Sequence, residues 1–96
     1  MTAEIFSKEM GVTHADFFRL LPRAMGDTPY TIQGMKVLGE LPGGSITIEL
    51  GEQQVRRIAL MAIPYAEVSF AFNGIDEEAR TGFMKYFDLR FQRGGG

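Results

Sequence analysis

The chain has 96 residues, of which 45% are hydrophobic and 23% are charged. A chain of this length can bury one hydrophobic core, and its composition is that of a folded protein rather than a disordered one. With 10 Lys and Arg residues against 12 Asp and Glu residues, the formal net charge is −2. No overall positive field is present to attract nucleic acid or anionic lipid, so we expect neither nucleic acid nor a membrane as partner.

The sequence contains no cysteine. This excludes disulfides, thiolate nucleophiles and cysteine-ligated zinc or iron–sulfur centres. No uninterrupted apolar run approaches the length of a signal-peptide core or of a bilayer span. We therefore expect a cytoplasmic protein with no metal and no cofactor.

The first predicted helix covers residues 14–25. Thr13 and Asp16 form the Thr-x-x-Asp pattern of a capping box, in which the threonine side chain accepts a hydrogen bond from the Asp16 N–H. Pro22 lacks an N–H group and distorts the last turn, and Gly26 is suited to end the helix.

Residues 30–37 alternate apolar and polar side chains, but the alternation shifts at Gly34. A glycine inside such a pattern indicates a β-bulge more often than a turn. We therefore predict one bent strand here, with a short hairpin as the alternative. Residues 45–50 alternate without a break, which is typical of an antiparallel strand with one face in solvent.

Residues 55–63 are predicted to form the next strand. From Ile58 to Ile63 its apolar residues occupy both faces, which favours a central strand or one covered by a partner. Pro64 interrupts the ladder, and residues 67–72 resume the alternation as a further strand.

A second helix is predicted after Asp76, whose side chain is a good N-cap, and Phe83 and Phe87 recur on one face of it. The predicted order is α-β-β-β-β-α. This order favours a two-layer α+β sandwich, in which a four-stranded antiparallel meander sheet carries the N- and C-terminal helices on one face. We expect residues 1–93 to form a single domain and residues 94–96 to form a flexible glycine tail.

One group of polar residues is a candidate for contacts with an anion or a small ligand. His14 is the only histidine, and it lies in the first turn of the first predicted helix. Arginine side chains suit carboxylates and phosphates. Because the sequence has neither a metal-binding histidine motif nor a nucleophile elbow, we predict no catalytic residue and no enzyme. The candidate ligand contacts are His14, Arg19, Arg23 and Arg57.

Two helices can cover only one face of a sheet, so some apolar residues are left exposed. Contiguous exposed apolar surface is typical of an interface. The main hypothesis is therefore a non-enzymatic protein-binding or accessory module, which binds another protein and forms a homodimer through the open sheet face or an edge strand. The candidate partner-binding residues are Phe18, Met61, Met84, Tyr86 and Leu89.

The sequence ends in Gly94-Gly95-Gly96. This ending resembles the C termini of ubiquitin-like proteins and sulfur carriers, in which glycines thread a narrow active-site channel. The resemblance is confined to these residues, and in those families the tail follows a strand of a β-grasp fold. It implies an alternative function, a carrier activated at the carboxylate of Gly96. A flexible chain end is the preferred interpretation.

Overall fold

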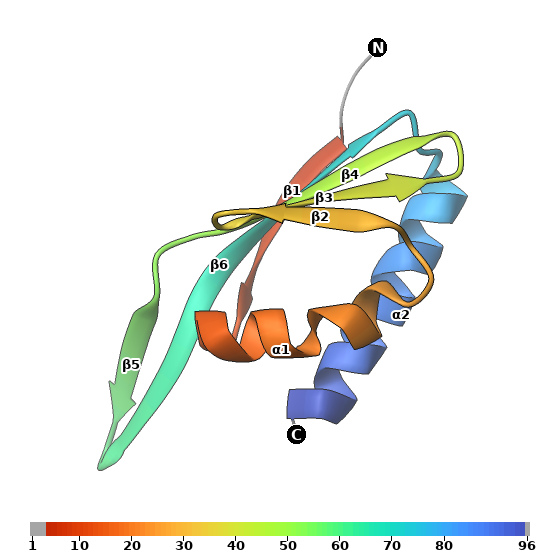
Figure 1. Ribbon diagram of the computed structural model, residues 1–96. Coiled ribbons are helices and arrows are strands. Elements are labelled where there is room, and N and C mark those ends of the chain that lie inside the picture. The colour runs from red at the N-terminus through yellow and green to blue at the C-terminus, as the bar shows by residue number, and fades with distance from the viewer. Residues whose placement is uncertain (1–3, 96) are drawn as a thin grey trace.

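The computed structural model describes residues 4–95. Within this range two helices and six strands form an α+β fold with an antiparallel sheet (Figure 1). The predicted class is confirmed, whereas the predicted four-stranded meander is wrong, because the sheet has six strands. In chain order the elements are β1 (Glu4–Met10), α1 (His14–Met25), β2 (Tyr30–Gln33), β3 (Lys36–Leu41), β4 (Gly44–Leu50), β5 (Gln54–Ile58), β6 (Met61–Asn73) and α2 (Glu77–Gly95).

The strands lie side by side in the order β1-β6-β4-β3-β2, and β5 pairs with the first part of β6. The N-terminal strand β1 was absent from the prediction. It pairs with β6 from Glu4 opposite Phe72 to Met10 opposite Ala66. The apolar and polar alternation of a strand is broken in β1, because the charged Lys8 lies on the side of the strand that faces the helices. There its ammonium group forms an ion pair with Asp88 of α2 at 2.6 Å.

The core lies between one face of the sheet and the two helices, which cover the same face (Figure 1). Buried residues alternate along β4 and along the second half of β6, as expected for strands with a single covered face. The opposite face is mainly polar, although Ile5, Leu38 and Ala71 also lie on it. On this face the Ser7 and Ser69 hydroxyls lie 3.1 Å apart. The fully buried large side chains are Phe17, Phe70, Phe72, Phe87, Leu21, Ile46, Ile48, Val37 and Val68.

Helix α1 has the bounds and the caps expected from the sequence. The Asp16 N–H donates to the Thr13 hydroxyl at 3.0 Å, and the Gly26 N–H donates to the Pro22 carbonyl at 3.1 Å. Gly26 has a φ of 61°, a value that favours glycine at the end of a helix. These local signals confirm the predicted helix over residues 14–25.

The bent strand predicted around Gly34 is wrong. Gln33 pairs with Lys36, so Gly34 and Met35 form the two-residue turn of a hairpin between β2 and β3. Gly34 has a φ of 61°, which glycine adopts without strain. The alternation of apolar residues shifts here because one strand ends and another begins.

The single strand predicted over residues 55–63 is also wrong. Ile58 pairs with Met61, so Ala59 and Leu60 form a second two-residue turn, and β6 runs on through Pro64. Ala59 has a φ of 55° without being a glycine, so the sequence carried no turn signal. We call β5 together with residues 61–65 the arm, a hairpin that projects from the body of the protein (Figure 1).

Candidate functional site

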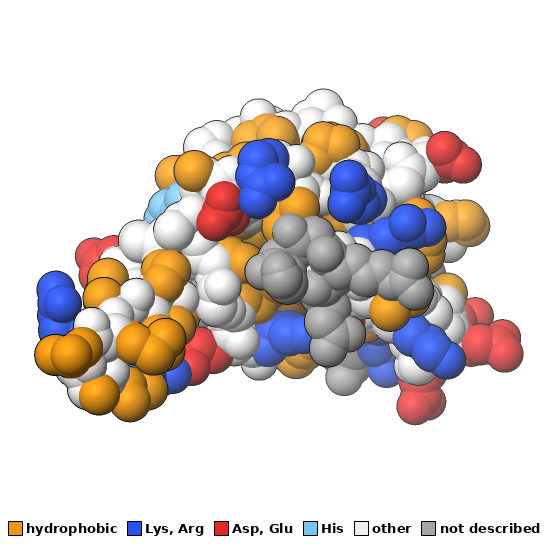
Figure 2. All heavy atoms as spheres, turned by 90° about the horizontal axis from the view of Figure 1, so that it is seen from below, with side chains coloured by type: hydrophobic (Ala, Val, Ile, Leu, Met, Phe, Trp, Pro, Cys, Tyr) orange, Lys and Arg blue, Asp and Glu red, His pale blue; other side chains and the backbone are white. Residues whose placement is uncertain are grey.

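Within residues 4–95, most of the large apolar side chains that are more than half exposed lie on the arm. Leu60 at its tip is 103% exposed and Met61 is 63% exposed, while Val55 and Ile58 are each 52% exposed. Figure 2 shows hydrophobic side chains gathered at the projecting left end of the molecule. A contiguous apolar surface of this kind on a projecting element is typical of an interaction site.

The register of the hairpin places apolar residues on both faces of the arm. Directly opposite residues share a face of a hairpin. Ile58 lies opposite Met61 on one face, and Val55 lies opposite Pro64 on the other. From Ile58 to Pro64 the side chains of the arm are all apolar, although Arg57 lies opposite Ala62 on the second face. This apolar run explains why Ile58 to Ile63 matched a buried strand.

The two arginines of the arm lie on opposite faces and have different surroundings. Arg56 is 3.0 Å from the carboxylate of Glu9 on β1, and its guanidinium stacks over the Tyr65 ring at 4.5 Å. Among the described residues no ion pair is recorded for Arg57. Arg56 thus helps to fix the arm to the body, and Arg57 leaves a positive charge beside the apolar tip.

Gln53 holds the base of the arm. Its side-chain oxygen accepts from the His14 N–H at 2.6 Å, and its side-chain nitrogen donates to the carbonyls of Val12 and Tyr65 at 3.2 and 3.1 Å. The Nε2 of His14 lies 2.7 Å from the Gly51 carbonyl. Because a carbonyl oxygen only accepts, this nitrogen is the donor. The start of α1, the loop before β5 and strand β6 are thereby joined.

We expect Gln53→Ala to lower the free energy of unfolding by about 1 to 2 kcal/mol, because it leaves partly buried backbone groups without partners. Gln54→Ala is the matched control. The side chain of Gln54 donates to the exposed Glu52 at 3.3 Å, and the Gln54 group that accepts from Gln53 is the backbone carbonyl, which alanine keeps. We therefore expect Gln54→Ala to change the free energy of unfolding by no more than about 0.5 kcal/mol. Urea unfolding followed by circular dichroism measures both, and equal effects of the two substitutions would contradict the role given to Gln53.

The four candidate ligand contacts are distributed over two elements. His14 uses one ring nitrogen within the fold, and Arg19 is 3.3 Å from Asp16 on its own helix. Arg23 is exposed in the last turn of α1, and Arg57 lies on the arm. No hydrogen bond or ion pair joins any two of the four within residues 4–95. Over residues 4–95 no group of acidic and histidine side chains lies close enough together to hold a metal ion.

The five candidate partner-binding residues are also separated. Met61 lies on the arm, whereas Phe18 and Met84 are partly buried against the core. Tyr86 and Leu89 are exposed on α2, by 40% and 46%. Sequence reasoning missed Val55, Ile58 and Leu60 because it placed them in a covered strand, although their apolar run was the available signal. Gly96, the candidate for C-terminal activation, lies outside the described residues.

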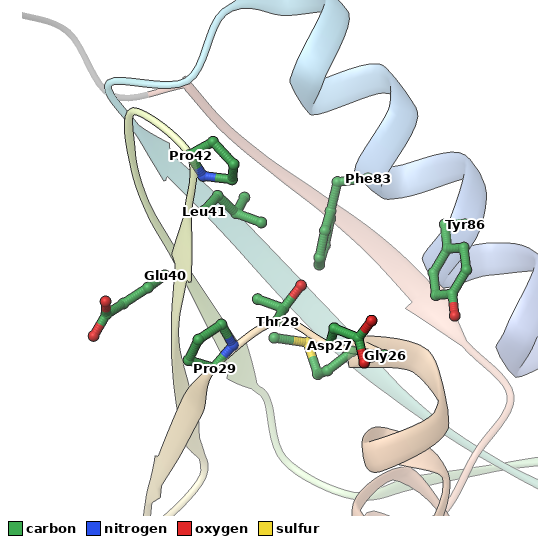
Figure 3. A pocket seen from close by; sticks show the side chains of 10 residues that line it. Gly26, Asp27, Thr28, Pro29, Glu40, Leu41, Pro42, Phe83 and Tyr86 are labelled. Atoms are coloured by element: carbon green, nitrogen blue, oxygen red, sulfur yellow. The ribbon is translucent and has the colours of Figure 1, made fainter.

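A cavity of about 550 Å³ opens between the C-terminal end of α1, the start of β2, the end of β3 and α2. Figure 3 shows Leu41 and Phe83 on opposite sides of it and Glu40 pointing away from it. Gly26 and Tyr86 both line the cavity and lie close together, since a Cβ added to Gly26 would be 3.0 Å from the Tyr86 hydroxyl. The lining residues are Met25, Gly26, Asp27, Thr28, Pro29, Glu40, Leu41, Pro42, Phe83 and Tyr86.

Over residues 4–95 neither helix combines the length and the apolar character needed to span a bilayer. Comparison of the chain with models of protein families, with curated proteins and with solved structures gave no match. The arm and the cavity are therefore the two features from which a function is argued.

Proposed function

We propose that this protein is a non-enzymatic protein-binding module whose binding element is the arm. The observation that supports this function is the exposure of Leu60, Met61, Ile58 and Val55 on one projecting hairpin. Burial of apolar surface stabilises a complex by roughly 25 cal/mol per Å² before the costs of association. A hairpin whose strands are already paired loses less conformational entropy on binding than an unstructured segment, which favours its use as a docking element.

Charges near the base of the arm favour a protein over an anionic membrane as the partner. Glu67 is exposed on β6 and Glu52 is exposed in the loop before β5, whereas the nearby Glu9 is paired with Arg56. An arm inserted into an anionic bilayer would bring these carboxylates toward the lipid phosphates, which repel them. A protein surface with an apolar pocket does not repel these carboxylates in this way.

The open face of the sheet supports an interface less well than the arm. Its residues include the polar Ser7, Ser69, Thr47 and Glu49, and Ile5, which is 66% exposed, is its most exposed large apolar side chain. Interface cores are depleted in charged residues and enriched in aromatic residues and methionine. The exposed apolar side chains of the arm therefore support an interface better than the open face of the sheet does.

The function is tested with a triple variant, Ile58→Ser, Leu60→Ser and Met61→Ser. We expect proteins that the tagged wild-type chain captures from its native cell extract to be captured at least about tenfold less by this variant, since anchor residues dominate binding energy. Quantitative mass spectrometry measures the captured amounts.

The matched control removes three other exposed apolar side chains, Ile5, Ile32 and Met35, which are 66%, 49% and 45% exposed and are not part of the arm. We expect the serine variant at these positions to capture the same proteins as wild type. Equal losses from both variants, or no loss from the arm variant, would contradict the proposed function. Circular dichroism of both variants confirms that they are folded.

A further inference from the structure

The cavity beside α2 has the shape and the lining of a receptor for apolar side chains. Its volume of about 550 Å³ lies within the range of protein binding pockets. Met25, Leu41 and Phe83 form apolar walls, and Figure 3 shows Leu41 and Phe83 facing each other across it. Most of the exposed surface that lines the cavity is apolar, although Asp27 and Thr28 also line it. The cavity is therefore better suited to an apolar group than to a polar ligand.

The tip of the arm offers apolar groups of the kind that this cavity accepts. Leu60 stands free of its own chain, and Ile58 and Met61 flank it on one face. In Figure 1 the arm extends away from the end of α1, the start of β2 and α2, which together line the cavity. A chain cannot place its own arm in its own cavity, but a second copy can supply one.

Charges on the two surfaces are complementary. Arg57 lies three residues before Leu60 on the arm, and Asp27 lines the cavity. Within residues 4–95, neither Arg57 nor Asp27 forms an ion pair. An arm that enters the cavity of another copy brings a positive charge to a rim that carries a negative one, and such matching favours the correct partner and register.

From these observations we infer that the arm of one copy docks into the cavity of a second copy, and that two such contacts form a symmetric dimer. This inference rests on the proposed function of the arm and names its partner. A two-fold axis relates the contacts, so each chain gives one arm and receives one, and the assembly closes at two copies.

The first test is the mass in solution, measured by light scattering after size-exclusion chromatography. We expect the wild-type chain to have about twice its mass of 10.7 kDa. Thr28→Trp fills the cavity without changing the arm, and the triple arm variant removes the tip without changing the cavity. We expect each of these variants to be a monomer, and the control variant at Ile5, Ile32 and Met35 to remain a dimer.

The second test mixes the two monomeric variants. The arm variant has an intact cavity, and the Thr28→Trp variant has an intact arm, so one contact can form between them. We expect the mixture to yield a heterodimer, detected by native mass spectrometry, that neither variant forms alone. Arg57→Glu is expected to weaken the dimer, and Asp27→Arg in the same chain is expected to restore it.

The outcomes separate this inference from the function on which it rests. A wild-type monomer at high micromolar concentration, or a dimer unaffected by Thr28→Trp, would overturn the arm-in-cavity dimer. If the arm variant still loses captured proteins in that case, the proposed binding function stands and its partner is a different chain. If removal of the tip reduces neither the dimer nor the amount of captured proteins, both the arm-in-cavity dimer and the proposed binding function are overturned.

Discussion

Gly44→Ala is expected to destabilise the protein by about 3 kcal/mol or more, because the added methyl group has no room. A Cβ on Gly44 would lie 1.8 Å from the carbonyl oxygen of Asn73 and 2.9 Å from its carbonyl carbon. These atoms belong to the backbone of β6, so no side-chain rotation relieves the overlap. Strands β4 and β6 would have to separate where Ser45 pairs with Asn73.

The same substitution at Gly82 is the control. Gly82 lies on α2, and nothing lies within 4 Å of a Cβ added there. Alanine is favoured over glycine inside a helix by about 0.5 to 1 kcal/mol, so Gly82→Ala is expected to stabilise the protein. Thermal and urea unfolding of the two variants should shift in opposite directions from wild type. An unchanged midpoint for Gly44→Ala would contradict the close packing of β4 against β6.

Elements with strong local signals could be predicted from the sequence. The capping box at Thr13 and the glycine after Met25 define α1, and the unbroken alternation at residues 45–50 gives most of β4. Asp76 caps α2 as predicted, since its carboxylate accepts from the Ala79 N–H at 2.8 Å. Each of these signals acts within a few residues of the chain, so the sequence contains all the required information.

Elements that depend on distant residues could not be predicted in this way. Lys8 lies on the covered side of β1 because Asp88 of α2 pairs with it, a contact that spans most of the chain. Ala59 holds a positive φ because the strands on either side of it pair as a hairpin. A positive φ at an alanine is rare, so propensity argues against the turn that the structure contains.

The candidate site was predicted only in part for the same reason. Met61 was among the predicted partner-binding residues, and it lies at the exposed tip of the arm. An apolar run on both faces is compatible with a buried strand and with a projecting arm, and only the position of the other elements distinguishes the two. Gln53 gave no signal, because a glutamine that bridges three segments looks like any loop glutamine.

Phe87→Ala is expected to lower the free energy of unfolding by about 3 to 5 kcal/mol, since it removes a large side chain from the centre of the core. Phe87 is fully buried on α2. Its ring lies 4.7 Å from that of Phe91, 5.4 Å from that of Phe70 on β6 and 6.3 Å from that of Phe17 on α1. One side chain therefore contacts both helices and the sheet, and the cavity left by alanine would loosen all three.

Leu89→Ala, two residues away on the same helix, separates this packing effect from a change in helix propensity. Leu89 is 46% exposed, so its truncation is expected to cost less than about 1 kcal/mol. Phe87→Leu keeps most of the volume and is expected to lie between wild type and Phe87→Ala. Urea unfolding that ranked Leu89→Ala at or above Phe87→Ala would show that α2 faces the sheet with the other side, and the placement of both helices over one core would then be wrong.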